Sequence, residues 1–178
     1  MTSADARTLL KAETAAAHRA LEDVVGPLLN RSDYVAYVRG LHAFRAPLEA
    51  ALAAHEFPQW RPTLLADSLA EDLAHLRAPR LEAEPAASGL QDRVKALGAL
   101  YVLEGSALGA RVLLVQVQTL GLDAQGGAKH LWRQAATLEN WRAFLPLLES
   151  ANDMSGVTAG ANAAFLAAER AMKRARNG

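Results

Sequence analysis

The apolar positions of this chain recur at helical spacing along nearly its whole length. Leu65, Leu69, Leu73 and Leu76 follow one another at intervals of three or four residues, as they would on one face of a helix. Alanine and leucine dominate, β-branched residues are sparse, and no segment shows the alternation typical of a strand. The pattern predicts an all-α fold, a compact bundle of about six to eight helices.

Helix breakers divide this pattern into segments. We expect Ser32 to cap the second helix, and Pro47 and Pro146 to kink or break the helices that contain them. The residues 78–88, with two prolines, form the longest expected loop. The expected helices cover residues 4–24, 32–55, 64–77, 90–120, 129–150 and 155–176.

Composition narrows the class of protein. A length of 178 residues suits one domain, residues 1–178. Lys plus Arg equals Asp plus Glu, 19 each, which argues against a nucleic-acid-binding surface, and the absence of cysteine excludes disulfides and thiolate ligands. The apolar run 113–122 is too short for a membrane span and is interrupted by Gln116 and Gln118, and the N-terminus lacks the apolar core of a signal peptide. We therefore expect a cytoplasmic protein that does not bind membranes.

The first expected helix carries a possible ligand. Lys11, His18 and Glu22 lie on one stripe of it, and three alanines before His18 leave space beside the imidazole ring. Glu22, one turn beyond, can accept a proton from Nδ1, which would orient the ring and make Nε2 a better ligand.

A lone histidine on an alanine-rich helix is more often part of the surface or the core. The other histidines have no histidine partner at metal-binding spacing, so a multi-histidine zinc site finds no support. We expect one of them, on the second helix, to reach the interior and the rest to lie at helix ends or on solvated faces: His42 inside, and His55, His75 and His130 outside.

The helix expected at 90–120 contains glycines that weaken it. Gly105 and Gly109 each cost roughly 1 kcal/mol relative to alanine in a helix interior. Two interpretations explain them: close packing against another helix, or a backbone surface against which a flat ligand lies, with the Ser106 hydroxyl beside it. The combination with a ligand-type histidine favours the flat ligand.

Four segments, in order along the chain, resemble the heme oxygenase family. LLKAETAAAHRALE (9–22) resembles the proximal-helix motif LKxxTxxxHxxxE, and YVLEGSALGARVL (101–113) resembles the distal-helix motif of bacterial members. LLADSLAEDLAHLRAP (64–79) and ANAAFLAAER (161–170) are similar to the intervening and closing helices. The resemblance covers nearly the whole chain and is closest to the soluble bacterial type, including members that supply the chromophore of bacteriophytochromes.

The resemblance implies an enzyme that cleaves heme to biliverdin, carbon monoxide and ferrous iron. It implies O₂ and an external electron donor, a ferredoxin or a reductase, and a bacteriophytochrome as a possible acceptor of biliverdin. In this family heme lies between the proximal and distal helices. His18 matches the axial iron ligand, Glu22 its hydrogen-bond partner, and Lys11 and Tyr101 match residues that bind the heme propionates.

On the distal side, Gly105, Ser106 and Gly109 match the family residues that lie over heme and are assigned the catalytic role. We expect the glycines to steer bound oxygen, and Ser106 with water to deliver a proton. Two departures stand out. Ser106 replaces an aspartate of mammalian members, and Ala110 replaces a second glycine, so that its methyl group is expected either to narrow the heme site or to stiffen the helix.

A late-helix Lys/Arg pair of mammalian members has no evident counterpart, although Arg111 or Arg142 can substitute. These departures leave open a non-catalytic heme carrier of the same fold. A helical interaction protein that binds no heme is the second alternative.

Overall fold

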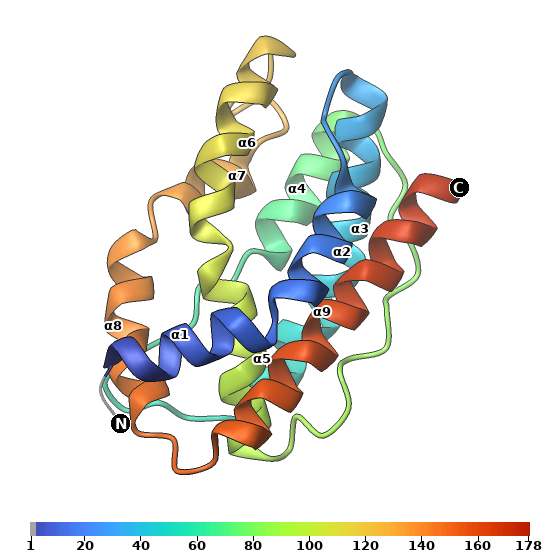
Figure 1. Cartoon of the computed structure of the whole chain (residues 1–178). Coiled ribbons are helices and arrows are strands. Elements are labelled where there is room, and N and C mark those ends of the chain that lie inside the picture. Colours follow the sequence, from blue (N-terminus) through green and yellow to red (C-terminus); the bar gives the residue numbers. More distant parts are fainter. Residues whose placement is uncertain (1–2) are drawn as a thin grey trace.

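The computed structural model describes residues 3–178, and its side chains are described from Ala6 onward. These residues form nine helices and no strand, which confirms the all-α prediction (Figure 1). The helices are α1 (Ser3–Glu13), α2 (Ala15–Val25), α3 (Arg31–Leu52), α4 (Ala66–Leu76), α5 (Arg93–Gly105), α6 (Ala107–Thr119), α7 (Lys129–Ala135), α8 (Leu138–Glu149) and α9 (Met154–Asn177).

The bundle is built around α9, which packs on α5, α3 and α2. At the crossing with α5, a Cβ atom on Gly98 would overlap the carbonyl oxygen of Val157, and one on Gly160 would overlap that of Lys95. Glycine therefore allows the two backbones to touch at this crossing. A second core lies between α3, α4, α6 and α7, so that α3 connects both apolar clusters.

The first expected helix is bent rather than continuous. It divides at Thr14, whose backbone has φ −102° and ψ 0°, and α1 runs across the base of the molecule while α2 rises from it (Figure 1). The Thr14 hydroxyl donates to the Leu10 carbonyl oxygen at 2.7 Å, a bond that often accompanies bends. The glycine-bearing helix likewise divides at Ser106 into α5 and α6.

Other helix ends correct the expectations in detail. Asn30, not Ser32, caps α3, since its side chain accepts from the Asp33 backbone N–H. Pro47 neither breaks nor ends α3: it cannot bond the Ala43 carbonyl, which instead accepts from the backbone N–H of Glu84 in the following loop. Pro146 lies within α8, and the break that was expected there falls between α7 and α8.

One stretch, Arg93–Thr119, is long and apolar enough by length and composition to cross a membrane. In the structure it is the bent α5–α6 pair. The core helix of a bundle passes the same test, so this stretch is weak evidence for a membrane protein. Only 44% of the apolar window is buried, which raises the question of what covers the rest of α6.

Candidate functional site

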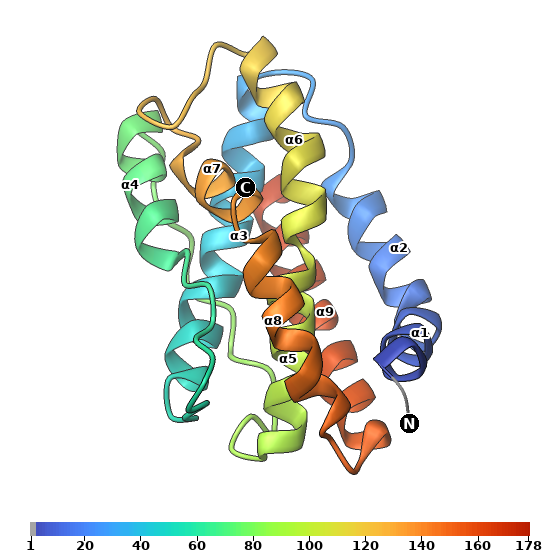
Figure 2. The ribbon, with the colours of Figure 1, turned by 90° about the vertical axis from the view of Figure 1, so that its left-hand side faces the viewer.

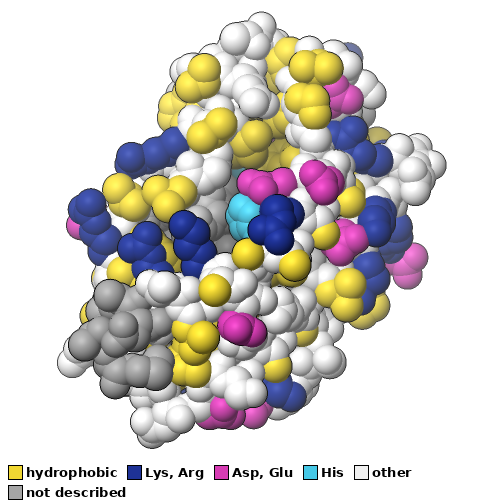
Figure 3. Space-filling view, viewed as in Figure 1, with side chains coloured by type: hydrophobic (Ala, Val, Ile, Leu, Met, Phe, Trp, Pro, Cys, Tyr) yellow, Lys and Arg dark blue, Asp and Glu magenta, His cyan; other side chains and the backbone are white. Residues whose placement is uncertain are grey.

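The proximal helix α2 is only partly covered by the rest of the bundle. Its apolar residues Ala17, Leu21 and Val24 are partly buried, Ala17 and Leu21 against the main core, and none of its residues is fully buried. The helix packs on α9, whereas α6 packs on α7, and α2 and α6 stand apart in both ribbon views (Figures 1 and 2). The space-filling view shows this face of the molecule hollowed at its centre, with a histidine side chain beside the hollow (Figure 3). We call the space between α2 and α6 the slot.

His18 projects from α2 with 56% of its side chain exposed. Its Nδ1 lies 3.2 Å from Oε2 of Glu22, the contact expected one turn along the helix. Its ring meets the Phe165 ring of α9 edge-on, with centroids 5.7 Å apart. A carboxylate at Nδ1 and an aromatic ring at the edge orient the imidazole and favour Nε2 as the atom that binds a ligand.

Across the slot, α6 presents bare backbone and exposed apolar side chains. A Cβ atom on Gly109 would have nothing within 4 Å, while one on Gly105 would lie 3.8 Å from the Trp141 ring. Val112 and Val115, on the following turns, are 62% and 65% exposed. Close helix packing therefore explains Gly98 but not Gly109, and a flat ligand is the better explanation of Gly109.

Two distal residues of the motif point away from the slot. The Ser106 hydroxyl donates to the Leu103 carbonyl oxygen at 2.5 Å and accepts from Nε2 of Gln134 on α7. Ala110 is buried in the core between α3, α4, α6 and α7. This placement corrects the expectation that the Ala110 methyl group narrows the heme site, because that group does not border the slot.

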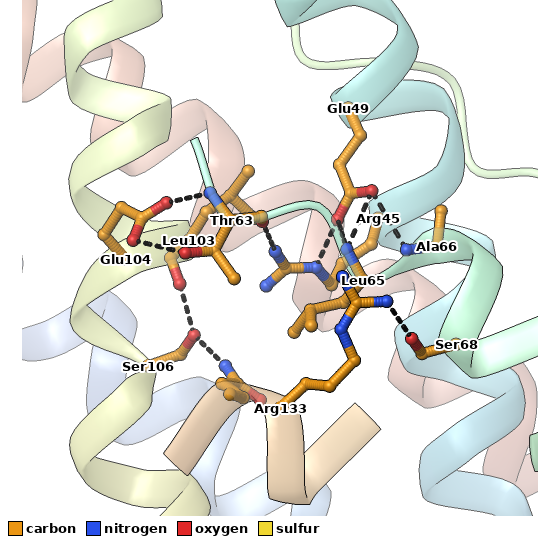
Figure 4. Close-up of polar contacts among 11 residues, drawn as sticks. Arg45, Glu49, Thr63, Leu65, Ala66, Ser68, Leu103, Glu104, Ser106 and Arg133 are labelled. Atoms are coloured by element: carbon orange, nitrogen blue, oxygen red, sulfur yellow. Dashed lines mark hydrogen bonds and ion pairs between the residues drawn. The ribbon is translucent and has the colours of Figure 1, made fainter. Parts of the chain in front are cut away.

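Behind α6, a buried polar network that the sequence analysis did not find supports the distal bend (Figure 4). The Glu104 carboxylate accepts from the Thr63 backbone N–H at 2.6 Å, from the Thr63 hydroxyl at 3.0 Å and from Nδ2 of Asn140 at 3.1 Å. Burial raises the pKa of Glu104, and these donors oppose the shift. Glu104 stands in the distal motif directly before Gly105, so the network holds the bend in place.

The same network joins α3 to α4. Nε of Arg45 donates to Oε1 of Glu49 at 2.7 Å, and Nη2 of Arg45 donates to the Thr63 carbonyl oxygen at 2.8 Å. The Glu49 carboxylate also accepts from the backbone N–H groups of Leu65 and Ala66, which start α4 (Figure 4). The sequence offered one signal of this ion pair. Arg45 and Glu49 are oppositely charged and lie four positions apart on one helix, among mostly apolar residues.

His130 lies in the core and not on a solvated face, contrary to the expectation. Its Nδ1 is 2.7 Å from Oδ2 of Asp72, which also accepts from the His130 backbone N–H. Burial lowers the pKa of His130, although Asp72 opposes this shift. His42 reaches the interior as expected, and burial lowers its pKa too.

The residues expected near the propionates lie where α1 meets α5. Tyr101 is half-buried on α5 beside the Trp141 ring, with centroids 5.8 Å apart, and Lys11 is exposed on α1. Burial raises the pKa of Tyr101, while the Thr14 hydroxyl and the Arg7 guanidinium lower it. A cation and a phenol from two helices are thus available at this end.

The two arginines considered as substitutes for the mammalian pair both have partners. Nε of Arg111 donates to the Ala135 carbonyl oxygen at 3.3 Å, at the end of α7. Arg142 pairs with Glu139 on the exposed surface of α8, at 2.6 Å.

Fold and site together define an all-helical protein in which a histidine-bearing helix and a bare stretch of helix backbone lie on opposite sides of one slot. No family model matches the chain. It is 30% identical over 141 residues to the heme oxygenase PigA of Pseudomonas aeruginosa, covering 74% of this chain and 71% of that protein. Its fold matches the crystal structure of the NO- and CO-bound heme oxygenase from Neisseria meningitidis with a TM-score of 0.77 and 25% identity, covering 96% of this chain and 91% of that one.

The chain belongs to the heme oxygenase family. It is an enzyme that degrades heme, as predicted.

Proposed function

We propose that the slot between α2 and α6 binds heme, and that the enzyme opens it to biliverdin, carbon monoxide and ferrous iron. The observation that carries this proposal is the open space over Gly109, across the slot from α2, where His18 projects with more than half of its side chain exposed. Bound heme supplies the iron at which O₂ is activated and the porphyrin carbon that is oxidised. The role of the protein's own residues is to position the heme.

His18 is the proposed axial ligand, through Nε2. A neutral imidazole is a moderate donor to iron, and the Glu22 contact at Nδ1 makes it a stronger one. Phe165 restricts rotation of the ring from the other side. The exposure of His18 fits this role, because a histidine already buried among core side chains has no room for a metal-centred ligand.

Gly105 and Gly109 are proposed to set the distal boundary. Without side chains there, the helix backbone would lie directly against heme in the slot and would limit the space above it. The Ser106 hydroxyl proton is donated to Leu103, so proton delivery through Ser106 requires rotation of that hydroxyl toward water in the slot.

Lys11 and Tyr101 are proposed to bind the propionates: Lys11 is an exposed cation on α1, and Tyr101 lies on α5 beside Thr14, the residue between α1 and α2. A raised pKa keeps the Tyr101 phenol protonated, and a protonated phenol can donate to a carboxylate. Ala110, buried behind α6, contributes to heme binding only by shaping that helix.

The electron donor is proposed to be a separate ferredoxin or reductase. A bacteriophytochrome that accepts biliverdin is a prediction from the sequence resemblance, and so is a cytoplasmic location. Membership of the heme oxygenase family supports the need for a redox partner but does not specify which protein it is.

The test is His18→Ala compared with His75→Ala, which removes an exposed histidine from α4. Heme titration followed at the Soret band, and turnover with a reductant, measure binding and chemistry separately. We expect His18→Ala to lose the histidine-ligated spectrum and to reduce turnover at least 100-fold (order of magnitude for losing the axial ligand), while His75→Ala behaves as wild type. A normal spectrum and turnover in His18→Ala would exclude His18 as the ligand.

A further inference from the structure

The slot has a cavity at the end farthest from Lys11. It has a volume of about 320 Å³ and is lined by residues of the α2–α3 turn and of α6: Pro27, Leu28, Leu29, Val115, Gln116 and Thr119. Leu29 is 75% exposed, an unusual degree for leucine. Gln116 follows Gly109 by two helical turns, or roughly 10 Å, so the cavity faces the edge of a ligand centred over Gly109.

Gln116 is a polar residue in this mostly apolar cavity. Its Oε1 atom is buried and has no hydrogen-bond partner among the residues that the structure describes. The neighbouring Thr119 hydroxyl is satisfied, because it donates to the Gln116 carbonyl oxygen at 2.6 Å. A buried acceptor without a donor is unfavourable, so the Gln116 amide is suited to a ligand that brings an N–H group.

Heme brings no N–H group to this cavity, whereas its product, biliverdin, does. The outer edge of heme carries methyl, vinyl and propionate groups, and its four nitrogens face the iron. Ring opening converts the two pyrroles beside the broken bridge into lactams, each with an N–H next to a carbonyl. A primary amide pairs with a lactam through two hydrogen bonds: Oε1 accepts from the N–H and Nε2 donates to the carbonyl.

We propose that Gln116 binds a terminal lactam ring of biliverdin and thereby recognises the product in preference to heme. This inference rests on the proposed function. The cavity accepts one ring and not a whole tetrapyrrole, and its apolar walls, Leu28, Leu29 and Val115, cover the faces of that ring. It follows that the opened edge of the macrocycle faces the α2–α3 turn, away from the propionates at Lys11.

The experiment measures binding and not turnover. The full-length apoprotein is titrated with biliverdin, followed by its visible absorbance and induced circular dichroism, and separately with hemin, followed at the Soret band. The variants are Gln116→Leu and the near-isosteric Gln116→Met, with Gln118→Leu, at an exposed glutamine of α6 that does not line the cavity, as the matched control. Urea unfolding of each apoprotein verifies that it is folded.

We expect both Gln116 variants to weaken biliverdin binding by roughly tenfold, the value of two net hydrogen bonds, with hemin binding changed less than about twofold. Gln118→Leu should change neither. Equal weakening of both ligands, or unchanged biliverdin binding, would overturn the assignment of Gln116 and leave the proposed function intact. If the wild-type protein binds no hemin, the proposed function fails first.

Discussion

Replacing Gly109 separates the two explanations of a glycine in a helix, because they predict opposite effects on stability. A Cβ atom there meets nothing within 4 Å, so Gly109→Ala only improves helix propensity. We expect the apoprotein to gain about 1 kcal/mol in free energy of unfolding, or roughly 2 to 4 °C in Tm for a chain of this size. Gly98→Ala is the matched control on α5.

At Gly98 the same methyl group would overlap the Val157 carbonyl oxygen and come within 2.6 Å of the Ala161 backbone nitrogen. Neither backbone can move without separating α5 from α9. We therefore expect Gly98→Ala to destabilise the protein by at least 2 to 3 kcal/mol, the order of a severe overpacking substitution. Urea and thermal unfolding of the two apoproteins, followed by far-UV circular dichroism, give both values.

The larger variant Gly109→Leu tests the slot itself. Its side chain would occupy the space proposed for heme, so hemin affinity should fall or the biliverdin isomer should change, while the apoprotein remains folded. Hemin titration and chromatography of the products are the assays. The reasoning is refuted if Gly109→Ala destabilises the apoprotein, or if Gly109→Leu binds and converts heme as wild type does.

Two further predictions concern the buried polar groups. Glu49→Ala should cost about 3 to 5 kcal/mol of unfolding free energy in urea titrations, because it leaves Arg45 charged and buried without its partner; Glu49→Gln should cost less. Burial lowers the pKa of His130 in the folded protein. As pH falls below about 6.5, the histidine therefore takes up a proton in the unfolded chain before it does so in the folded protein. Stability should then decline between pH 7 and 5, by at most about 1.4 kcal/mol per pH unit for this group, and unfolding curves of His130→Gln should show a shallower decline; equal slopes would exclude His130 as a cause.

The sequence by itself determined what depends on neighbours one or two turns away. The prediction of α4 rested on Leu65, Leu69, Leu73 and Leu76, which share one helix face, and all four are buried. The contact between His18 and Glu22 follows from a spacing of four residues in any helix. The proximal and distal motifs were readable for the same reason, since each spans two helices that follow one another directly along the chain.

Only the tertiary structure determined the surroundings of residues that look equivalent in the sequence. Gly98 and Gly109 look alike in the sequence, but one touches α9 and the other faces open space. Ala110 adjoins Gly109 and yet points into the core, because the bend at Ser106 sets the rotation of α6.

Pro47 stays within its helix because a loop nearly forty residues later supplies a donor for the carbonyl that Pro47 leaves unbonded. The network of Arg45, Glu49 and Glu104 likewise joins segments far apart in the chain. Such contacts form between helices, and their partners are set by how the helices cross. Local spacing carries no information about that crossing, so these features were outside the reach of the sequence pattern.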